Sequence, residues 1–88
     1  MTFRVFYRQK RDYTRAVEDL LEDLKRQYQK TFEYIDPDTP GGVETARVYD
    51  IMDYPTFLVT MHDGHEVTRR TGLPLPTVED LASMFVSI

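Results

Sequence analysis

Apolar side chains recur along this chain with two different spacings, and the two spacings predict different elements. Residues 3–8 alternate between strongly apolar and more polar side chains, which predicts a strand with one apolar face. Asp12 precedes a helical pattern and is predicted to cap it, because an Asp carboxylate accepts hydrogen bonds from the first free N–H groups. The apolar positions of that helix fall every third or fourth residue. They are Tyr13, Ala16, Val17, Leu20, Leu21, Leu24 and Tyr28.

The middle of the chain predicts a second strand and a short second helix. The segment Thr31–Asp36 is rich in aromatic and β-branched residues, which are typical of strands. A strand, a helix and a strand of these lengths predict a right-handed unit with two parallel strands. Thr39 followed by Pro40 is typical of a helix N-terminus. Gly41 and Gly42 are each expected to weaken the first turn by about 1 kcal/mol relative to alanine.

A hairpin of two strands is predicted next. Pro55 stands directly before the apolar run Thr56–Met61. Proline lacks the N–H that a central ladder needs, so it belongs at the first residue of a strand. Asp63 and Gly64 predict the hairpin turn, because glycine tolerates a positive φ. The returning strand, His65–Thr71, is polar enough to lie at the edge of the sheet.

A final helix is predicted after residues 72–76, a proline-rich stretch that reads as a stiff connector. Thr77 and Asp80 have the spacing of a capping box, in which each residue binds the backbone N–H of the other. The apolar stripe of this helix comprises Val78, Leu81, Ala82 and Phe85, and Ile88 would extend it.

The composition of the chain excludes several classes of function. Residues 1–88 are enough for one domain, and 41% hydrophobic residues are enough for one core. The net charge of −4 argues against general binding to nucleic acid or to anionic membranes. No apolar run approaches the roughly 20 residues of a membrane span, and no leader pattern precedes the first strand, so we expect a cytoplasmic protein. The chain has no cysteine, which excludes disulfides, thiolate metal sites and thiol catalysis.

The predicted order of elements is strand, helix, strand, helix, strand, strand, helix. The second half adds Ala46, Tyr49 and Ile51 at the end of the small helix, then Tyr54-Pro55-Thr56, Asp63-Gly64 and Gly72. In this order and at these spacings, the chain resembles the minimal core of the thioredoxins and glutaredoxins. The resemblance implies an α/β fold with a four-stranded mixed sheet in the order 2-1-3-4. It places the first and third helices on one face and the second helix on the other, and it makes the Tyr54–Pro55 peptide cis.

The chain departs from that family at its functional loop. Catalytic members carry two cysteines, separated by two residues, where the first helix begins. Arg11-Asp12-Tyr13-Thr14 occupies this place here. None of these side chains can form a thiolate or a mixed disulfide, so thiol–disulfide oxidoreductase activity is not expected.

A binding surface can survive the loss of the cysteines. In the family, the residue before the cis-proline offers its backbone N–H and C=O to an extended peptide or to glutathione. By resemblance Tyr54 has this role. The predicted peptide-binding or ligand-binding set is Arg11, Tyr13, Tyr54, Pro55, Thr56, Gly72 and Leu73. A structural role for Pro55 alone, with no ligand, is the alternative.

A basic cluster precedes the first helix, at residues Arg8, Lys10 and Arg11. The N-terminus of a helix attracts anions, so these residues form a candidate anion site. The alternative is a solvated loop. His62 and His65 flank the hairpin turn at a spacing that matches no zinc pattern, so no metal and no cofactor are predicted.

Three functions follow from these features. The first is a redox-inactive module that binds an extended or acidic segment of a partner protein near Tyr54, Pro55 and Arg11. The second is part of an enzyme in which Arg11, Tyr13 or Thr14 acts on a thiol cofactor such as glutathione. The third is a structural subunit that assembles through a sheet edge or through Leu73–Pro76. The chain is expected to be a monomer or a weak dimer.

Overall fold

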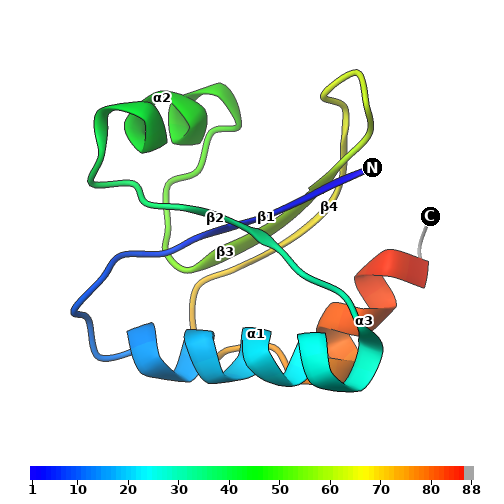
Figure 1. The fold of residues 1–88 in the computed structure, drawn as a ribbon. Coiled ribbons are helices and arrows are strands. Elements are labelled where there is room, and N and C mark those ends of the chain that lie inside the picture. The colour runs from blue at the N-terminus through cyan, green and yellow to red at the C-terminus, as the bar shows by residue number, and fades with distance from the viewer. Residues whose placement is uncertain (87–88) are drawn as a thin grey trace.

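A computed structural model describes residues 1–86 as one mixed sheet between two layers of helices (Figure 1). The order of elements agrees with the order predicted from the sequence. The elements are β1 (Thr2–Phe6), α1 (Thr14–Tyr28), β2 (Glu33–Ile35), α2 (Pro40–Val48), β3 (Thr56–Thr60), β4 (Glu66–Thr71) and α3 (Val78–Val86).

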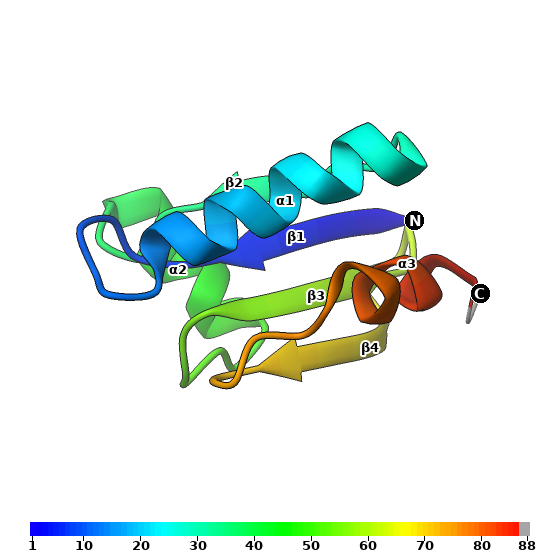
Figure 2. The same ribbon diagram turned by 90° about the horizontal axis from the view of Figure 1, so that it is seen from below.

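The four strands lie in the order β2-β1-β3-β4, which confirms the predicted topology. β1 is parallel to β2 and antiparallel to β3, and β4 is antiparallel to β3 at the edge of the sheet. Figures 1 and 2 show α1 and α3 side by side on one face of the sheet, with α2 alone on the other face. The resemblance to the thioredoxin core predicted this division of the helices.

β3 is buried along its whole length, at all five residues. Because successive side chains of a strand point to opposite faces, β3 contributes to two separate cores. The core against α2 is the smaller and consists of Phe6, Ala46, Ile51 and Leu58. The core against α1 and α3 consists of Val5, Tyr7, Val17, Leu24, Phe57, Val59, Leu81 and Met84.

The second strand is shorter than the sequence suggests. The strand pattern covers Thr31–Asp36, whereas β2 comprises only Glu33–Ile35. Phe32 instead joins an aromatic cluster, with its ring centroid 6.2 Å from that of Phe3 and 5.7 Å from that of Phe57. The burial of its ring against these side chains takes the place of pairing to β1.

Two of the predicted helix caps are present. The Thr39 hydroxyl accepts a hydrogen bond from the Gly42 N–H at 3.0 Å, at the start of α2. Thr77 and Asp80 form the expected capping box, because each side chain accepts a hydrogen bond from the backbone N–H of the other residue at 3.1 Å. The predicted contribution of Ile88 lies outside the described residues.

The two glycines of α2 have different environments, although the sequence treats them alike. A Cβ atom on Gly42 would lie 1.7 Å from the carbonyl oxygen of Asp36, whereas nothing lies within 4 Å of a Cβ atom on Gly41. The obstructing atom belongs to the backbone, so it cannot rotate away. Gly42 is therefore required where the loop at Asp36 crosses the first turn of α2.

Replacing each glycine with alanine tests this difference. We expect Gly42→Ala to lower the free energy of unfolding by about 2 kcal/mol or more, because a backbone segment must move. Gly41→Ala, the matched control, should raise it by up to about 1 kcal/mol, since alanine favours helix. Urea denaturation measures both values. Equal effects of the two substitutions would contradict the close approach of Gly42 to Asp36.

The capping box predicts a pH dependence of stability. Hydrogen bonds from the Thr77 backbone and side chain, aided by Arg70, lower the pKa of Asp80. A lowered pKa in the folded state means that the ionised carboxylate stabilises the fold above its unfolded pKa of about 3.9 and loses that effect as the pH falls. Asp80→Asn should therefore destabilise the protein at neutral pH and have less effect at about pH 3.

Thermal unfolding at both pH values measures the Asp80 effect. Glu79→Gln is the control, because it removes a neighbouring carboxylate that takes no part in the capping box. If Asp80→Asn were equally destabilising at both pH values, the ionised carboxylate would not be the stabilising group.

Candidate functional site

The loop before α1 is closed by one buried hydroxyl group. The Thr14 side chain is 7% exposed. Its hydroxyl donates a hydrogen bond to the carbonyl of Arg8 at 2.6 Å and accepts one from the N–H of Arg11 at 3.0 Å. The Tyr13 hydroxyl accepts a further hydrogen bond from the N–H of Arg8 at 3.1 Å. These bonds give the loop a defined shape without a metal or a disulfide.

The predicted cap of α1 by Asp12 is wrong. The capping position is Tyr13, which has helical backbone angles and makes no side-chain capping bond, and Asp12 lies exposed in the turn before it. The physical reason is the Thr14 hydroxyl. It binds both Arg8 and Arg11 and thereby fixes the chain so that α1 begins at Thr14.

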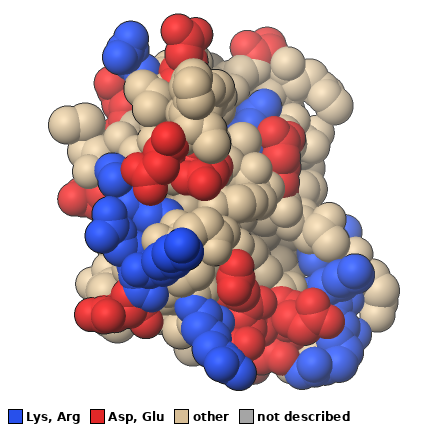
Figure 3. Space-filling model, turned by 60° about the vertical axis from the view of Figure 1, so that its left-hand side comes forward, with Lys and Arg blue, Asp and Glu red and all other residues tan. Residues whose placement is uncertain are grey.

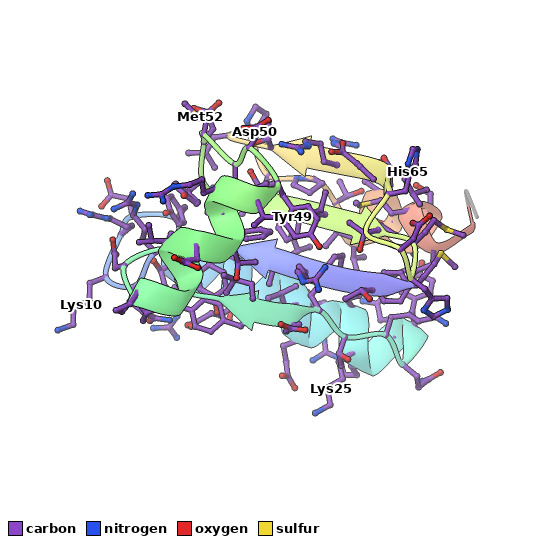
Figure 4. The ribbon with its side chains drawn as sticks, turned by 90° about the horizontal axis from the view of Figure 1, so that it is seen from above. Lys10, Lys25, Tyr49, Asp50, Met52 and His65 are labelled. Carbon is purple, nitrogen blue, oxygen red and sulfur yellow. The ribbon has the colours of Figure 1, made fainter. Side chains whose placement is uncertain are left out.

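Arg8 is held by two partners from other parts of the chain. Its Nη1 atom lies 2.8 Å from the Asp38 carboxylate, and its guanidinium carbon lies 4.9 Å from the centroid of the Tyr54 ring. The positive charge of Arg8 is therefore partly balanced by Asp38. Lys10 and Arg11 are exposed and make no ion pair within residues 1–86. Figure 4 shows Lys10 pointing away from the body of the molecule.

The Tyr54–Pro55 peptide is cis, as predicted, and the Leu73–Pro74 peptide is also cis, which the sequence did not indicate. The loops that carry these two peptides are joined by a backbone hydrogen bond of 2.8 Å from the N–H of Gly72 to the carbonyl of Pro55. Gly72 has a φ of +74°, a conformation that glycine adopts readily. The Pro55 and Gly72 loops therefore form one unit.

Thr56 fixes the same unit from the inside. Its hydroxyl donates to the Asp53 carbonyl at 2.7 Å and shares a hydrogen bond of 2.5 Å with the Thr71 hydroxyl. Pro55 and Thr56 are buried, so they support the surface rather than form it.

The backbone of Tyr54 and the side chain of Leu73 remain available to a ligand at this surface. Within residues 1–86, neither the N–H nor the C=O of Tyr54 makes a hydrogen bond. The Leu73 side chain is 64% exposed. A main-chain donor and acceptor beside an exposed apolar side chain can bind an extended peptide by strand addition.

The structure brings most of the predicted site residues together through shared partners. Arg8 contacts Tyr54, Tyr13 binds Arg8, and Gly72 binds Pro55. Lys10 and Arg11 are the exceptions, because their side chains make no hydrogen bond or ion pair in the described part of the chain.

Sequence reasoning missed Asp38 as the partner of Arg8. No local signal could have identified it, because the two residues are separated by 30 positions and meet only in the folded protein.

The surface charge around the site is mixed. On the face that Figure 3 draws, groups of lysine and arginine side chains alternate with groups of carboxylates, and neither sign covers a broad area. Beneath the loop, the Tyr7 hydroxyl donates a hydrogen bond to Glu18 at 3.2 Å. Burial, together with the charge of Glu18, raises the pKa of Tyr7 above its ordinary value of 10.0, so this tyrosine stays neutral.

The residues that the structure describes offer few other kinds of site. No three of their histidine, aspartate and glutamate side chains are grouped in a way that could hold a metal ion. None of the helices within residues 1–86 combines the length and the apolar character needed to cross a bilayer.

Among the comparisons with known proteins, only the comparison with solved structures found similar proteins. No protein-family profile matches the sequence, and no curated protein matches it. Thioredoxin O2 from Arabidopsis thaliana superposes with a TM-score of 0.72 at 17% identity, over 99% of this chain and 73% of that one. Thioredoxin 1 from Thermosipho africanus gives a TM-score of 0.68 at 13% identity, over 98% and 91% of the two chains. A malarial protein gives 0.71 at 14% identity, over 97% and 92%.

These matches and the topology of the sheet define the fold. The chain has a thioredoxin-like fold, and it has no cysteine with which to carry out thiol–disulfide exchange.

Replacement of Thr14 tests how the loop before α1 is held. Thr14→Val keeps the shape of the side chain and removes the hydroxyl, which leaves the Arg11 N–H without its acceptor. We expect a loss of about 1–3 kcal/mol in the free energy of unfolding and faster hydrogen exchange at the Arg11 amide. Thr14→Ser retains the hydroxyl and should have the smaller effect. Urea denaturation and amide exchange provide the measurements, and equal behaviour of the two variants would contradict the role of the hydroxyl.

Proposed function

We propose that this chain is a redox-inactive thioredoxin-like domain that binds an extended, acidic segment of another protein. The observation that carries the proposal is the backbone of Tyr54. Within residues 1–86 its N–H and C=O are both without hydrogen-bond partners, and the exposed Leu73 lies on the loop that Gly72 joins to Pro55. Two backbone hydrogen bonds would give affinity, and the neighbouring side chains would give selectivity.

The loop before α1 would supply the preference for an acidic segment. Lys10 and Arg11 are exposed and lack carboxylate partners in the described part of the chain. Arg8 packs over the Tyr54 ring and links this loop to the peptide surface. Because Asp38 already balances Arg8, the acidic residue of the partner would lie beside Lys10 and Arg11.

The second function considered, chemistry on a thiol cofactor, has less support. Thr14 would be the natural hydroxyl for such a role, since it stands where a family cysteine would lie. Thr14 is instead a buried residue, 7% exposed, and its hydroxyl is hydrogen-bonded to the backbone of both Arg8 and Arg11. A buried hydroxyl with both bonds made is poorly placed to reach a cofactor.

A titration monitored by NMR tests the proposal. The labelled chain is mixed with a capped peptide of alternating valine and aspartate, and separately with one of alternating valine and lysine. We expect saturable shifts of the Tyr54, Gly72 and Leu73 amides with the acidic peptide only. Arg11→Glu should weaken binding by about tenfold, since an attraction becomes a repulsion.

Lys25→Glu is the matched control, because it makes the same change of charge at the other end of α1. It should leave the affinity for the acidic peptide unchanged. The proposal fails if neither peptide produces saturable shifts at Tyr54, or if both peptides bind equally well.

A further inference from the structure

Arg4 is a half-buried arginine without a carboxylate partner. It lies on β1, on the face of the sheet covered by α2, opposite Glu33 on β2 and Leu58 on β3. Its Nη1 atom donates to the Tyr49 hydroxyl at 3.2 Å and to the Thr60 hydroxyl at 3.3 Å. None of the ion pairs within residues 1–86 involves it.

The geometry of its bonds leaves one side of the guanidinium group available. Both hydrogen bonds use Nη1, and neither Nε nor Nη2 has a partner in the described part of the chain. Nε and Nη2 together form a parallel pair of N–H donors, which is the arrangement that binds a carboxylate at two points. The Tyr49 ring, with its centroid 5.2 Å from the guanidinium carbon, holds the group in place.

Arg4 lines a hollow of about 300 Å³, which lies between the sheet and the second half of α2. The other lining residues are Glu44, Thr45, Val48 and Tyr49. In Figure 4, α2 lies over one end of the sheet only, and Tyr49 lies where the strands emerge from beneath the helix. A hollow of this size is at the lower limit of ligand pockets, so it suits a small molecule.

The walls of the hollow differ in chemistry. The Glu44 side chain makes no hydrogen bond or ion pair within residues 1–86, so it adds an unpaired negative charge to the hollow that Arg4 also lines. Val48, which is 75% exposed, and the Tyr49 ring provide apolar surface. A simple anion would bind Arg4 but would be repelled by Glu44. A molecule that carries a carboxylate, an ammonium group and an apolar side chain would match all of these groups.

We propose that this hollow binds a free α-amino acid with an apolar side chain. Nε and Nη2 of Arg4 bind the carboxylate, Glu44 binds the ammonium group, and Val48 and Tyr49 contact the side chain. The hollow shares no lining residue with the peptide surface at Tyr54, so this proposal does not depend on the function proposed above.

The first test compares three ligands against the labelled chain by NMR. They are leucine, 4-methylpentanoate, which lacks the ammonium group, and isopentylamine, which lacks the carboxylate. We expect saturable shifts of the Arg4, Val48 and Tyr49 amides with leucine in the millimolar range, and affinities about tenfold lower for the other two. Absence of saturable shifts with leucine would overturn the proposal, as would equal binding of leucine and 4-methylpentanoate.

Variants assign the roles of the two charged residues. Arg4→Lys keeps the positive charge but removes the parallel donors, and it should weaken leucine binding by about tenfold. Arg47→Lys, on α2 but outside the hollow, is the matched control and should have no effect. Glu44→Gln should weaken the binding of leucine without weakening that of 4-methylpentanoate.

Each variant result bears on the proposal. Unchanged leucine affinity in Arg4→Lys, or in Glu44→Gln, would overturn it. If Arg4→Lys fails to fold, Glu44→Gln decides the question alone, because Glu44 is exposed on the surface of α2.

Discussion

The complete burial of β3 is the constraint on which the rest of the structure depends. Phe57 and Val59 face α1 and α3, whereas Leu58 faces α2, and all three are fully buried. A strand that is apolar on both faces requires cover on both sides, because exposed apolar surface is unfavourable in water. The three helices are therefore divided between the two faces of the sheet. The polar ends of β3, Thr56 and Thr60, are buried as well and are tolerated because their hydroxyls are hydrogen-bonded.

Unequal cover of the two faces of the sheet leaves the hollow beside α2 open. α1 and α3 together cover one face, but α2 has nine residues and covers only one end of the other. Arg4, on β1 beside α2, therefore lines an open hollow. At the start of β3, where Tyr54 packs against the core beneath α2, Gly72 binds Pro55, and the backbone of Tyr54 makes no hydrogen bond within residues 1–86. Both candidate sites thus border the core between the sheet and α2, one through Tyr49 and the other through Tyr54.

Much of the fold and part of the site could be predicted from the sequence, because local rules govern them. Period-two and period-3.6 patterns identified the strands and helices, and Thr39, Thr77 and Gly64 marked caps and a turn through short-range hydrogen bonds or a positive φ. Asp12 was predicted as a cap and is not one, since the Thr14 hydroxyl binds backbone groups three and six residues earlier in the chain. The pairing of Arg8 with Asp38 and the environment of Arg4 could not be predicted, because no local sequence pattern indicates them.

The sequence by itself determined the class of architecture, the position of the cis peptide before β3 and the absence of thiol chemistry. Residue types and their spacing within a few positions predict the elements and exclude thiol chemistry, whereas the order of the strands and the cis peptide are what the resemblance to the thioredoxin core implies. Only the tertiary structure decided that Gly42 must be glycine, that Arg8 is balanced, and that Arg4 is left without a carboxylate beside a hollow. The Gly42 constraint depends on how the loop from Asp36 folds back over the first turn of α2. The environments of Arg8 and Arg4 depend on residues 30 or more positions away, which come close only when the sheet and the helices have assembled.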